Sequence, residues 1–185
     1  MSPADKRWPD IQFAVLRGRP TVNRHLRRFG ESVAHYREFP GSATWQGIFA
    51  VRNGIFRWFL DECSFAKTPW LVMLDDDIVL TAESEPFLAS TADVTGPHVV
   101  GATDGIEVHP HTLSAAAVKL SRAAVAALGE CWKPPADGSC GCPVLFNACL
   151  RAGIQPAKAG TVGHRVPVTV LPGPIFVLDA DVRGL

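Results

Sequence analysis

Residues 69–77 read Pro-Trp-Leu-Val-Met-Leu-Asp-Asp-Asp, and this stretch decides the fold of the chain. Its first six residues are apolar without interruption, which is typical of a strand buried on both faces. Such strands lie inside parallel sheets, where helices cover both faces of the sheet. The stretch therefore predicts a central strand of an α/β domain, followed at its carboxyl end by three aspartates.

Strand and helix patterns alternate on the amino-terminal side of this stretch. Strand patterns cover Ile11–Leu16 and Ser32–Phe39, and glycine and proline follow both of them closely. Between them, Val22–Phe29 has a helical pattern that stops at Gly30. In residues 48–60 the apolar side chains recur at helical spacing, which predicts a second helix. The order strand, helix, strand, helix, strand is typical of a parallel α/β sheet.

The carboxyl-terminal half has fewer regular patterns. Strands are expected over Val99–Thr103 and Val166–Leu171, where short apolar runs occur. A helix is expected over Cys142–Ala152, because proline stands near its start and Gly153 just past its end.

The segment 114–128 is compatible with two structures. Its alanine content favours one long helix, and propensity by itself selects that prediction. The alternative is a strand over Leu113–Leu120 followed by a helix that Ser121 caps and Gly129 closes.

Length and composition limit the class of protein. The chain has 185 residues, of which 47% are apolar and 19% charged, as in an ordinary globular protein. One domain over residues 1–185 is expected at this length. No apolar run reaches the roughly 18 residues that span a bilayer. The amino terminus lacks the hydrophobic stretch of a signal peptide, and the five cysteines have no regular spacing. We therefore expect reduced thiols and a cytoplasmic location.

The net charge of zero hides an uneven distribution. Residues 1–60 contain ten Lys or Arg and four Asp or Glu, whereas residues 61–110 contain one Lys and ten acids. The two segments either neutralise each other across the surface or form one site that holds an anion beside a cation. A uniformly basic face that would bind nucleic acid nonspecifically is not evident.

Asp75, Asp76 and Asp77 are the strongest chemical signal. Ligand sites in open α/β sheets lie at the carboxyl ends of strands. Crowded carboxylates repel one another unless a cation offsets their charge. Mg²⁺ and Mn²⁺ prefer oxygen ligands and are commonly bound by one or two carboxylates together with substrate phosphates. The three residues thus predict a divalent-metal site, and the alternative is a solvated turn without function.

With its neighbours, this motif resembles the hydrophobic strand and Asp-x-Asp motif of glycosyltransferases with the GT-A fold, especially those similar to family two. Other segments resemble parts of that family in the same order. They are the first strand and nucleotide-binding loop (Val15–Pro20), the Ala-Arg-Asn helix start (Ala50–Asn53), the strand and Arg-containing helix start at the acceptor site (Ala116–Ala124), the late helix (Cys149–Ile154) and the metal-binding His strand (Gly163–Arg165).

The resemblance implies a three-layer α/β/α sandwich with a mostly parallel sheet. It implies an enzyme that moves a sugar from a nucleotide-diphosphate donor with the help of Mn²⁺ or Mg²⁺. In that family, the metal ligands would correspond to Asp77 and His164, and Asp75 would approach the ribose or base. The remaining donor contacts implied are Arg17, Gly18, Arg19, Arg52 and Asp76.

The sequence departs from the family where an acidic Glu-Asp pair often supplies the general base of inverting transfer. The comparable segment here is Ser139–Cys142, and the nearest acid is Asp137. The base is therefore Asp137 or another acid such as Asp104 or Glu107, or the reaction is a retaining one that needs no such base.

The acceptor is open at this point. A saccharide, a lipid-linked or small molecule, and a hydroxymethylated DNA base of the kind that phage transferases modify are all compatible with the sequence. Two other functions also remain: a nucleotidyltransferase that grips a nucleoside triphosphate, and a degenerate nucleotide-binding scaffold.

Overall fold

The computed structural model describes residues 7–17, 24–42, 44–64, 66–101, 105–109, 113–134 and 141–164. Within these ranges the strands are β1 (Arg7–Arg17), β2 (Val33–Pro40), β3 (Trp70–Asp75), β4 (Ile78–Val79), β5 (Val94–Gly101), β6 (Glu107–His109), β7 (Ala117–Ser121) and β8 (Ala157–His164). The helices are α1 (Arg24–Ser32), α2 (Trp45–Glu62), the 3₁₀ helix η2 (Ala82–Ser84), α3 (Glu85–Ala89), α4 (Arg122–Leu128) and α5 (Gly141–Arg151).

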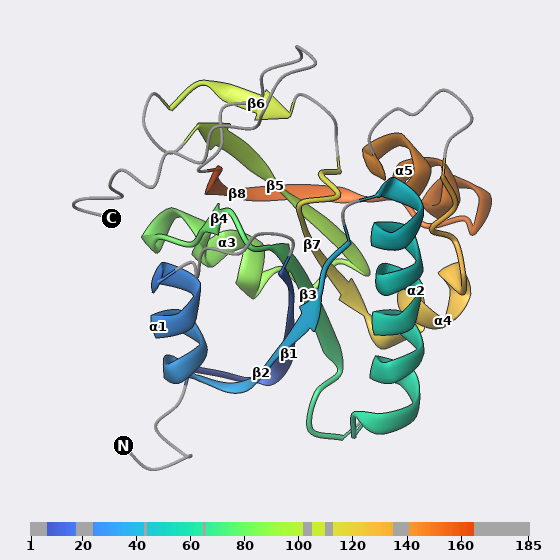
Figure 1. The fold of residues 1–185 in the computed structure, drawn as a ribbon, viewed down its shortest axis with the longest axis horizontal. Helices are drawn as coiled ribbons and strands as arrows, with labels where there is room; N and C mark the ends of the chain where they lie inside the picture. The colour runs from blue at the N-terminus through green and yellow to red at the C-terminus, as the bar shows by residue number, and fades with distance from the viewer. Residues whose placement is uncertain are drawn as a thin grey trace.

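The strands form one mixed sheet in the order β2-β1-β3-β7-β5-β8-β4, with β6 paired to β5 (Figure 1). Strand β1 is parallel to both β2 and β3, and β5 is parallel to β8. Strand β7 lies antiparallel between β3 and β5. Consequently β2, β1, β3, β5 and β8 all run in one direction, which confirms the mostly parallel sheet. The central position of β3 is also confirmed.

Helices cover both faces of the sheet and create two hydrophobic clusters. Leu71 and Met73 of β3 belong to the cluster under α2, α4 and α5. Val72 and Leu74 belong to the cluster under α1 and α3. Successive side chains of a strand point to opposite faces, so a strand buried on both must be apolar at every position. This explains the uninterrupted apolar run and confirms the three-layer arrangement.

Helix α2 includes the predicted 48–60 segment and begins earlier. Thr44 caps it, because its side-chain oxygen accepts a hydrogen bond from the Gly47 N–H at 3.1 Å. Helix α1 continues to Ser32, past the end predicted at Gly30. No helix in the described part of the chain combines the length and apolar character needed to cross a membrane.

The single helix predicted over 114–128 is wrong, and the alternative of a strand followed by a helix is right. Strand β7 is buried at every position and pairs along β3. The Ser121 hydroxyl accepts a hydrogen bond from the Ala124 N–H at 3.0 Å, and Gly129 follows the last residue of α4. Helix propensity is a weak preference, which burial and strand pairing override here.

Two other strands differ from prediction. Strand β5 begins at Val94 rather than Val99. Strand β8 was not predicted from its residue pattern, which is rich in small residues and has one fully buried position, Val162. The strand predicted over Val166–Leu171 lies outside the described residues.

Candidate functional site

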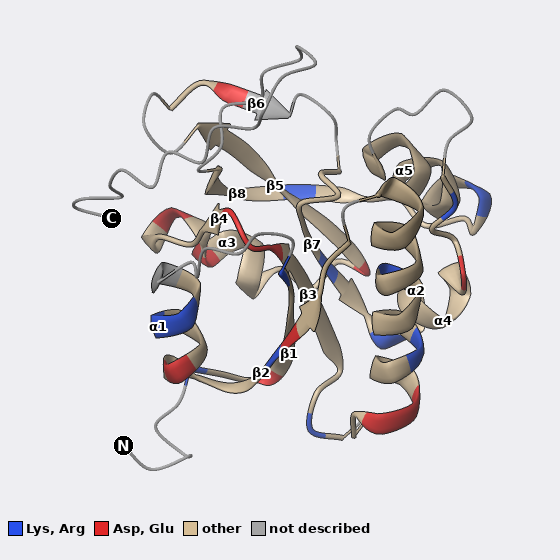
Figure 2. Ribbon diagram, in the orientation of Figure 1, with Lys and Arg blue, Asp and Glu red and all other residues tan. Residues whose placement is uncertain are grey.

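The three aspartates lie where the end of β3 meets the end of β8. Asp75 is the last residue of β3 and pairs with Leu16 of the parallel strand β1. Asp77 directly precedes β4, in which Ile78 pairs with His164 at the end of β8. In Figure 2, the acidic segment between β3 and β4 is part of the red ribbon next to β4. The sheet therefore brings residues 75–77 and 164 together, although almost 90 positions separate them in the sequence.

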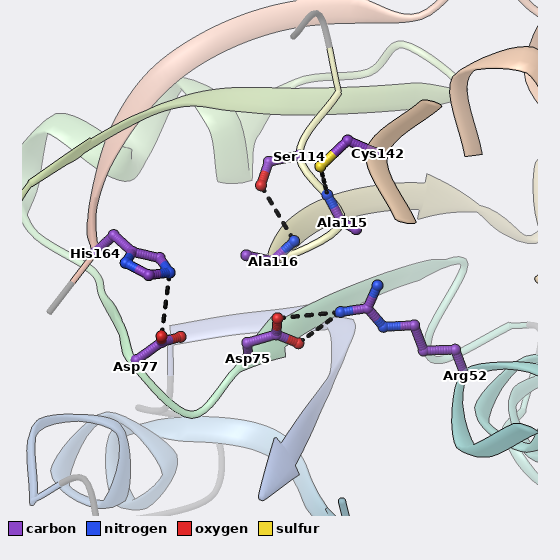
Figure 3. Close-up of polar contacts among 8 residues, drawn as sticks. All are labelled: Arg52, Asp75, Asp77, Ser114, Ala115, Ala116, Cys142 and His164. Carbon is purple, nitrogen blue, oxygen red and sulfur yellow. Dashed lines mark hydrogen bonds and ion pairs between the residues drawn. The ribbon is translucent and has the colours of Figure 1, made fainter. Parts of the chain in front are cut away.

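Asp77 and His164 face each other directly (Figure 3). Asp77 Oδ2 lies 3.1 Å from His164 Nε2, and the two side chains are 6% and 10% exposed. A carboxylate oxygen and an imidazole nitrogen are both suitable ligands for Mn²⁺. Among the described residues, no group of three or more His, Cys, Asp or Glu could hold a metal ion. Asp77 and His164 could therefore supply two ligands, and a metal held here would need its other ligands from outside the described residues.

Asp75 is bound by Arg52 of α2. The Arg52 Nη2 atom donates to both carboxylate oxygens, at 2.8 Å and 3.1 Å. The side chain of Arg52 is 2% exposed, whereas that of Asp75 is 33% exposed. Burial raises the pKa of Asp75, the Arg52 guanidinium opposes this increase, and the charge of Asp77 adds to it.

Trp132 completes the surroundings of Arg52. Its ring lies 4.9 Å from the guanidinium carbon, and its backbone is held by Asn53, which accepts from the Trp132 N–H and donates to its carbonyl. Arg52 Nε and Nη1 are buried and have no hydrogen-bond partner among the described residues. The Arg-Asn pair at positions 52 and 53 therefore anchors Asp75 on one side and Trp132 on the other.

A backbone segment before β7 connects Asp75 to the start of α5. The Asp75 N–H donates to the Ala116 carbonyl at 2.8 Å, and the Ala116 N–H donates to Ser114 Oγ at 3.1 Å. The Ala115 N–H donates to the Sγ atom of Cys142, the second residue of α5, at 3.2 Å (Figure 3). Sequence reasoning related Ala116 to the acceptor site only through the family resemblance. It missed the contacts of Ser114 and Ala115 with their neighbours, because small residues that bond mainly through backbone groups show no motif.

The structure describes only some of the other residues that were predicted to contact the donor. Arg17 ends β1 at the same edge of the sheet as Asp75, but its Nη1 atom forms an ion pair with Glu38 at 2.9 Å. Asp76 lies in the turn between β3 and β4. Gly18, Arg19, Asp104 and Asp137 lie outside the described residues.

Glu107, considered as a general base, is engaged elsewhere. It lies on β6 and accepts a hydrogen bond from Lys158 Nζ at 2.8 Å, and His98 Nδ1 lies 3.4 Å from the same oxygen. The hydrogen bond from Lys158, and then that from His98, lower the pKa of Glu107. A carboxylate with a lowered pKa that is bound by a lysine ammonium group is a poor proton acceptor.

Arg122 is not part of this site, contrary to the expectation that the start of its helix lies at the acceptor. Strand β7 is antiparallel to β3, so Ser121 pairs with Trp70 at the opposite end of β3 from Asp75. There, Arg122 donates to the carbonyls of Leu60 and Cys63 at 3.0 Å and 2.6 Å. It thus caps the carboxyl end of α2.

We expect Cys131 and Cys149 to alkylate slowly. Both are free thiols, and burial raises the pKa of each to about 11. Since only the thiolate reacts, the shift from about 9 lowers their reactive fraction at pH 8 about 100-fold. Iodoacetamide labelling followed by mass spectrometry measures the rates, with the urea-unfolded chain as the control. Equal rates in the folded and unfolded chain would contradict the expectation.

Solved glycosyltransferase structures have a similar fold. The catalytic domain of Drosophila beta1,4-galactosyltransferase 7 in complex with xylobiose matches with a TM-score of 0.52 and 11% identity, over 83% of this chain and 70% of that one. A mutant of that enzyme in complex with manganese, UDP-Gal and xylobiose matches with a TM-score of 0.50 and 15% identity, over the same shares. A glycosyltransferase involved in glycosylation of the major capsid of PBCV-1 matches with a TM-score of 0.50 and 11% identity, over 80% of this chain and 82% of that one.

No protein-family model matches the sequence, and no curated protein is detectably similar to it. At identities of 11% to 15%, the structural matches concern the fold alone. The chain therefore has a GT-A-like fold, as expected from the resemblance of its motifs.

Proposed function

We propose that the protein is a metal-dependent glycosyltransferase that moves a sugar from a nucleotide-diphosphate donor to a hydroxyl acceptor. The observation that carries this proposal is the contact between Asp77 and His164 beside Asp75, at the carboxyl edge of a GT-A-like sheet. The solved complex of the Drosophila enzyme with manganese and UDP-Gal supports the same ligand chemistry on a similar fold.

In this proposal, Asp77 Oδ2 and His164 Nε2 would hold Mn²⁺ or Mg²⁺ together with oxygens of the donor diphosphate. When bound, the metal stabilises the negative charge that develops on the leaving diphosphate. Asp75 contacts the ribose or base, and Arg52 orients its carboxylate through two hydrogen bonds. Arg17, Gly18, Arg19 and Asp76 contribute the other donor contacts.

For the acceptor side, the proposal names candidates for the general base and classes of acceptor rather than one residue and one molecule. Asp104 and Asp137 are the candidates for the general base, since Glu107 is held by Lys158 and His98. A saccharide, a small molecule and a hydroxymethylated DNA base are the acceptor classes to test.

A panel of nucleotide sugars with Mn²⁺ tests the proposed function. We expect at least one of them to release its nucleoside diphosphate, and EDTA to stop this release. The same nucleotide at 100 times its Kd should stabilise the fold by about 2.7 kcal/mol, which a thermal-shift assay detects. Stabilisation without turnover would indicate a binding scaffold. Release of pyrophosphate from a nucleoside triphosphate would indicate a nucleotidyltransferase. A complete lack of stabilisation and turnover would reject nucleotide chemistry at this site.

A further inference from the structure

Strand β8 contains a β-bulge between the two halves of its pairing with β5. Gly96 pairs with Lys158 and His98 with Thr161, so two residues of β8, 159 and 160, lie opposite the single residue Pro97. Proline has no N–H to donate to the ladder, and bulges are among the few places where a sheet tolerates it. The extra residue shifts the register of everything that follows in β8.

Gly160 is the bulge residue that no other amino acid replaces without strain. Its φ angle is +67°, which favours glycine. A Cβ atom at this position would lie 2.7 Å from the Phe87 backbone nitrogen and 3.0 Å from the Glu83 carbonyl oxygen. Both are backbone atoms of η2 and α3, so a side chain could be accommodated only by moving the chain.

Ser84 holds the strand from the same side. It is fully buried, its hydroxyl donates to the Thr161 carbonyl at 2.7 Å, and it accepts from the Thr81 N–H at 3.0 Å. The segment 81–87 follows Asp77 and β4 closely in the chain. The segment that follows Asp77 therefore also holds the bulge of β8, and β8 ends in the other candidate ligand, His164.

The register beyond the bulge decides where His164 points. Val162 lies in the core with Val99, and His164 pairs with Ile78, next to Asp77. Because side chains alternate along a strand, a slip by one residue would turn both Val162 and His164 to the opposite face. The contact of 3.1 Å between His164 and Asp77 depends on this register.

We propose that Gly160 is a positioning residue of the metal site: the bulge that it forms sets the register that places His164 against Asp77. This inference rests on the proposed function, in which those two side chains bind the divalent metal. It adds that the affinity for the metal is set partly at Gly160 in the β8 bulge, four residues before the ligand His164.

The test compares Gly160→Ala with Gly153→Ala. Gly153 has a nearly identical φ of +71° but no atom within 4 Å of its Cβ position, so it is a matched control for backbone strain. Both variants should melt a few degrees lower than wild type. The dissociation constant of Mn²⁺, measured by electron paramagnetic resonance in the presence of a nucleoside diphosphate, should rise about 10- to 100-fold in Gly160→Ala only. Unchanged affinity in Gly160→Ala would overturn the inference.

Two further measurements keep the outcome decisive. If Gly160→Ala does not fold, Ser84→Ala replaces it, and an affinity for Mn²⁺ equal to that of wild type overturns the inference. If wild type does not bind Mn²⁺ more tightly than the nucleoside diphosphate alone does, the proposed metal site fails. The metal-free crystal structure of Gly160→Ala then decides the positioning separately, and a His164–Asp77 contact that persists in it overturns the inference.

Discussion

Asp77→Asn should lower Mn²⁺-dependent release of the nucleoside diphosphate about 100- to 1000-fold while the chain stays folded. The asparagine keeps the shape of the side chain but removes the negative charge that we propose binds the metal. The charge of Asp77 also raises the pKa of Asp75, so the two carboxylates repel each other in the metal-free protein. Loss of one charge relieves that repulsion but weakens the contact with His164, and the asparagine oxygen can still accept a hydrogen bond there, so the change in melting temperature should be small. Initial rates over a Mn²⁺ titration measure the effect.

Asp61→Asn is the matched control for this variant. Asp61 lies near the end of α2 and is exposed, so its replacement should leave both rate and metal dependence unchanged. If Asp77→Asn shows wild-type rates with the same dependence on Mn²⁺, Asp77 is not a metal ligand and the proposed site is wrong.

Arg52→Ala should lower the free energy of unfolding by about 3 kcal/mol at pH 7.5. Removal of one partner from a buried ion pair leaves the other charge uncompensated, which costs about 3–5 kcal/mol. The lower end applies because the Asp75 side chain is 33% exposed. The ring of Trp132 also loses the guanidinium that lies 4.9 Å from it. Urea unfolding followed by tryptophan fluorescence measures the loss.

The loss should shrink as the pH is lowered. Arg52 opposes the raised pKa of Asp75, so without Arg52 that pKa rises further. A carboxyl whose pKa is higher in the folded than in the unfolded state binds protons more tightly when folded. The stabilisation that protonated Asp75 gives to the folded variant is therefore complete below the pKa of Asp75 in the unfolded chain. It is lost as the pH rises through the pKa of Asp75 in the folded chain. Unfolding at pH 5 should show a smaller deficit than unfolding at pH 7.5.

Arg57→Ala provides the control on the same helix. Arg57 and its partner Glu130 both have side chains that are 62% exposed, and exposed ion pairs contribute at most about 1 kcal/mol. Equal losses in the Arg52 and Arg57 variants would show that the pair between Arg52 and Asp75 is not the strong interaction that its burial implies.

Local patterns were sufficient to predict the framework of the fold. The uninterrupted apolar run before Asp75 reports burial on both faces of a strand, and the spacing of apolar residues in 48–60 reports one buried face of a helix. Both properties belong to contiguous residues, so they can be recognised without knowledge of the partners. The position of three aspartates at the end of such a strand predicted the place of the candidate site for the same reason.

Properties that depend on pairing between distant segments were decided only by the tertiary structure. Residues 117–121, which lie within the alanine-rich segment 114–128, form a strand because β3 and β5 flank them. The antiparallel direction of that strand places Arg122 away from the aspartates. The partner of Asp75, Arg52, lies 23 positions earlier on a helix, and the bulge at Gly160 exists because Pro97 and residues 81–87 adjoin it. The sequence by itself determined the strands and helices that carry a strong hydrophobic pattern and the edge where the carboxylates gather. Strand register and ion-pair partners required the assembled sheet, because each is a property of two segments and is encoded in neither alone. The proximity of His164 to Asp77, which the family resemblance implied, comes about because β4 pairs with the end of β8.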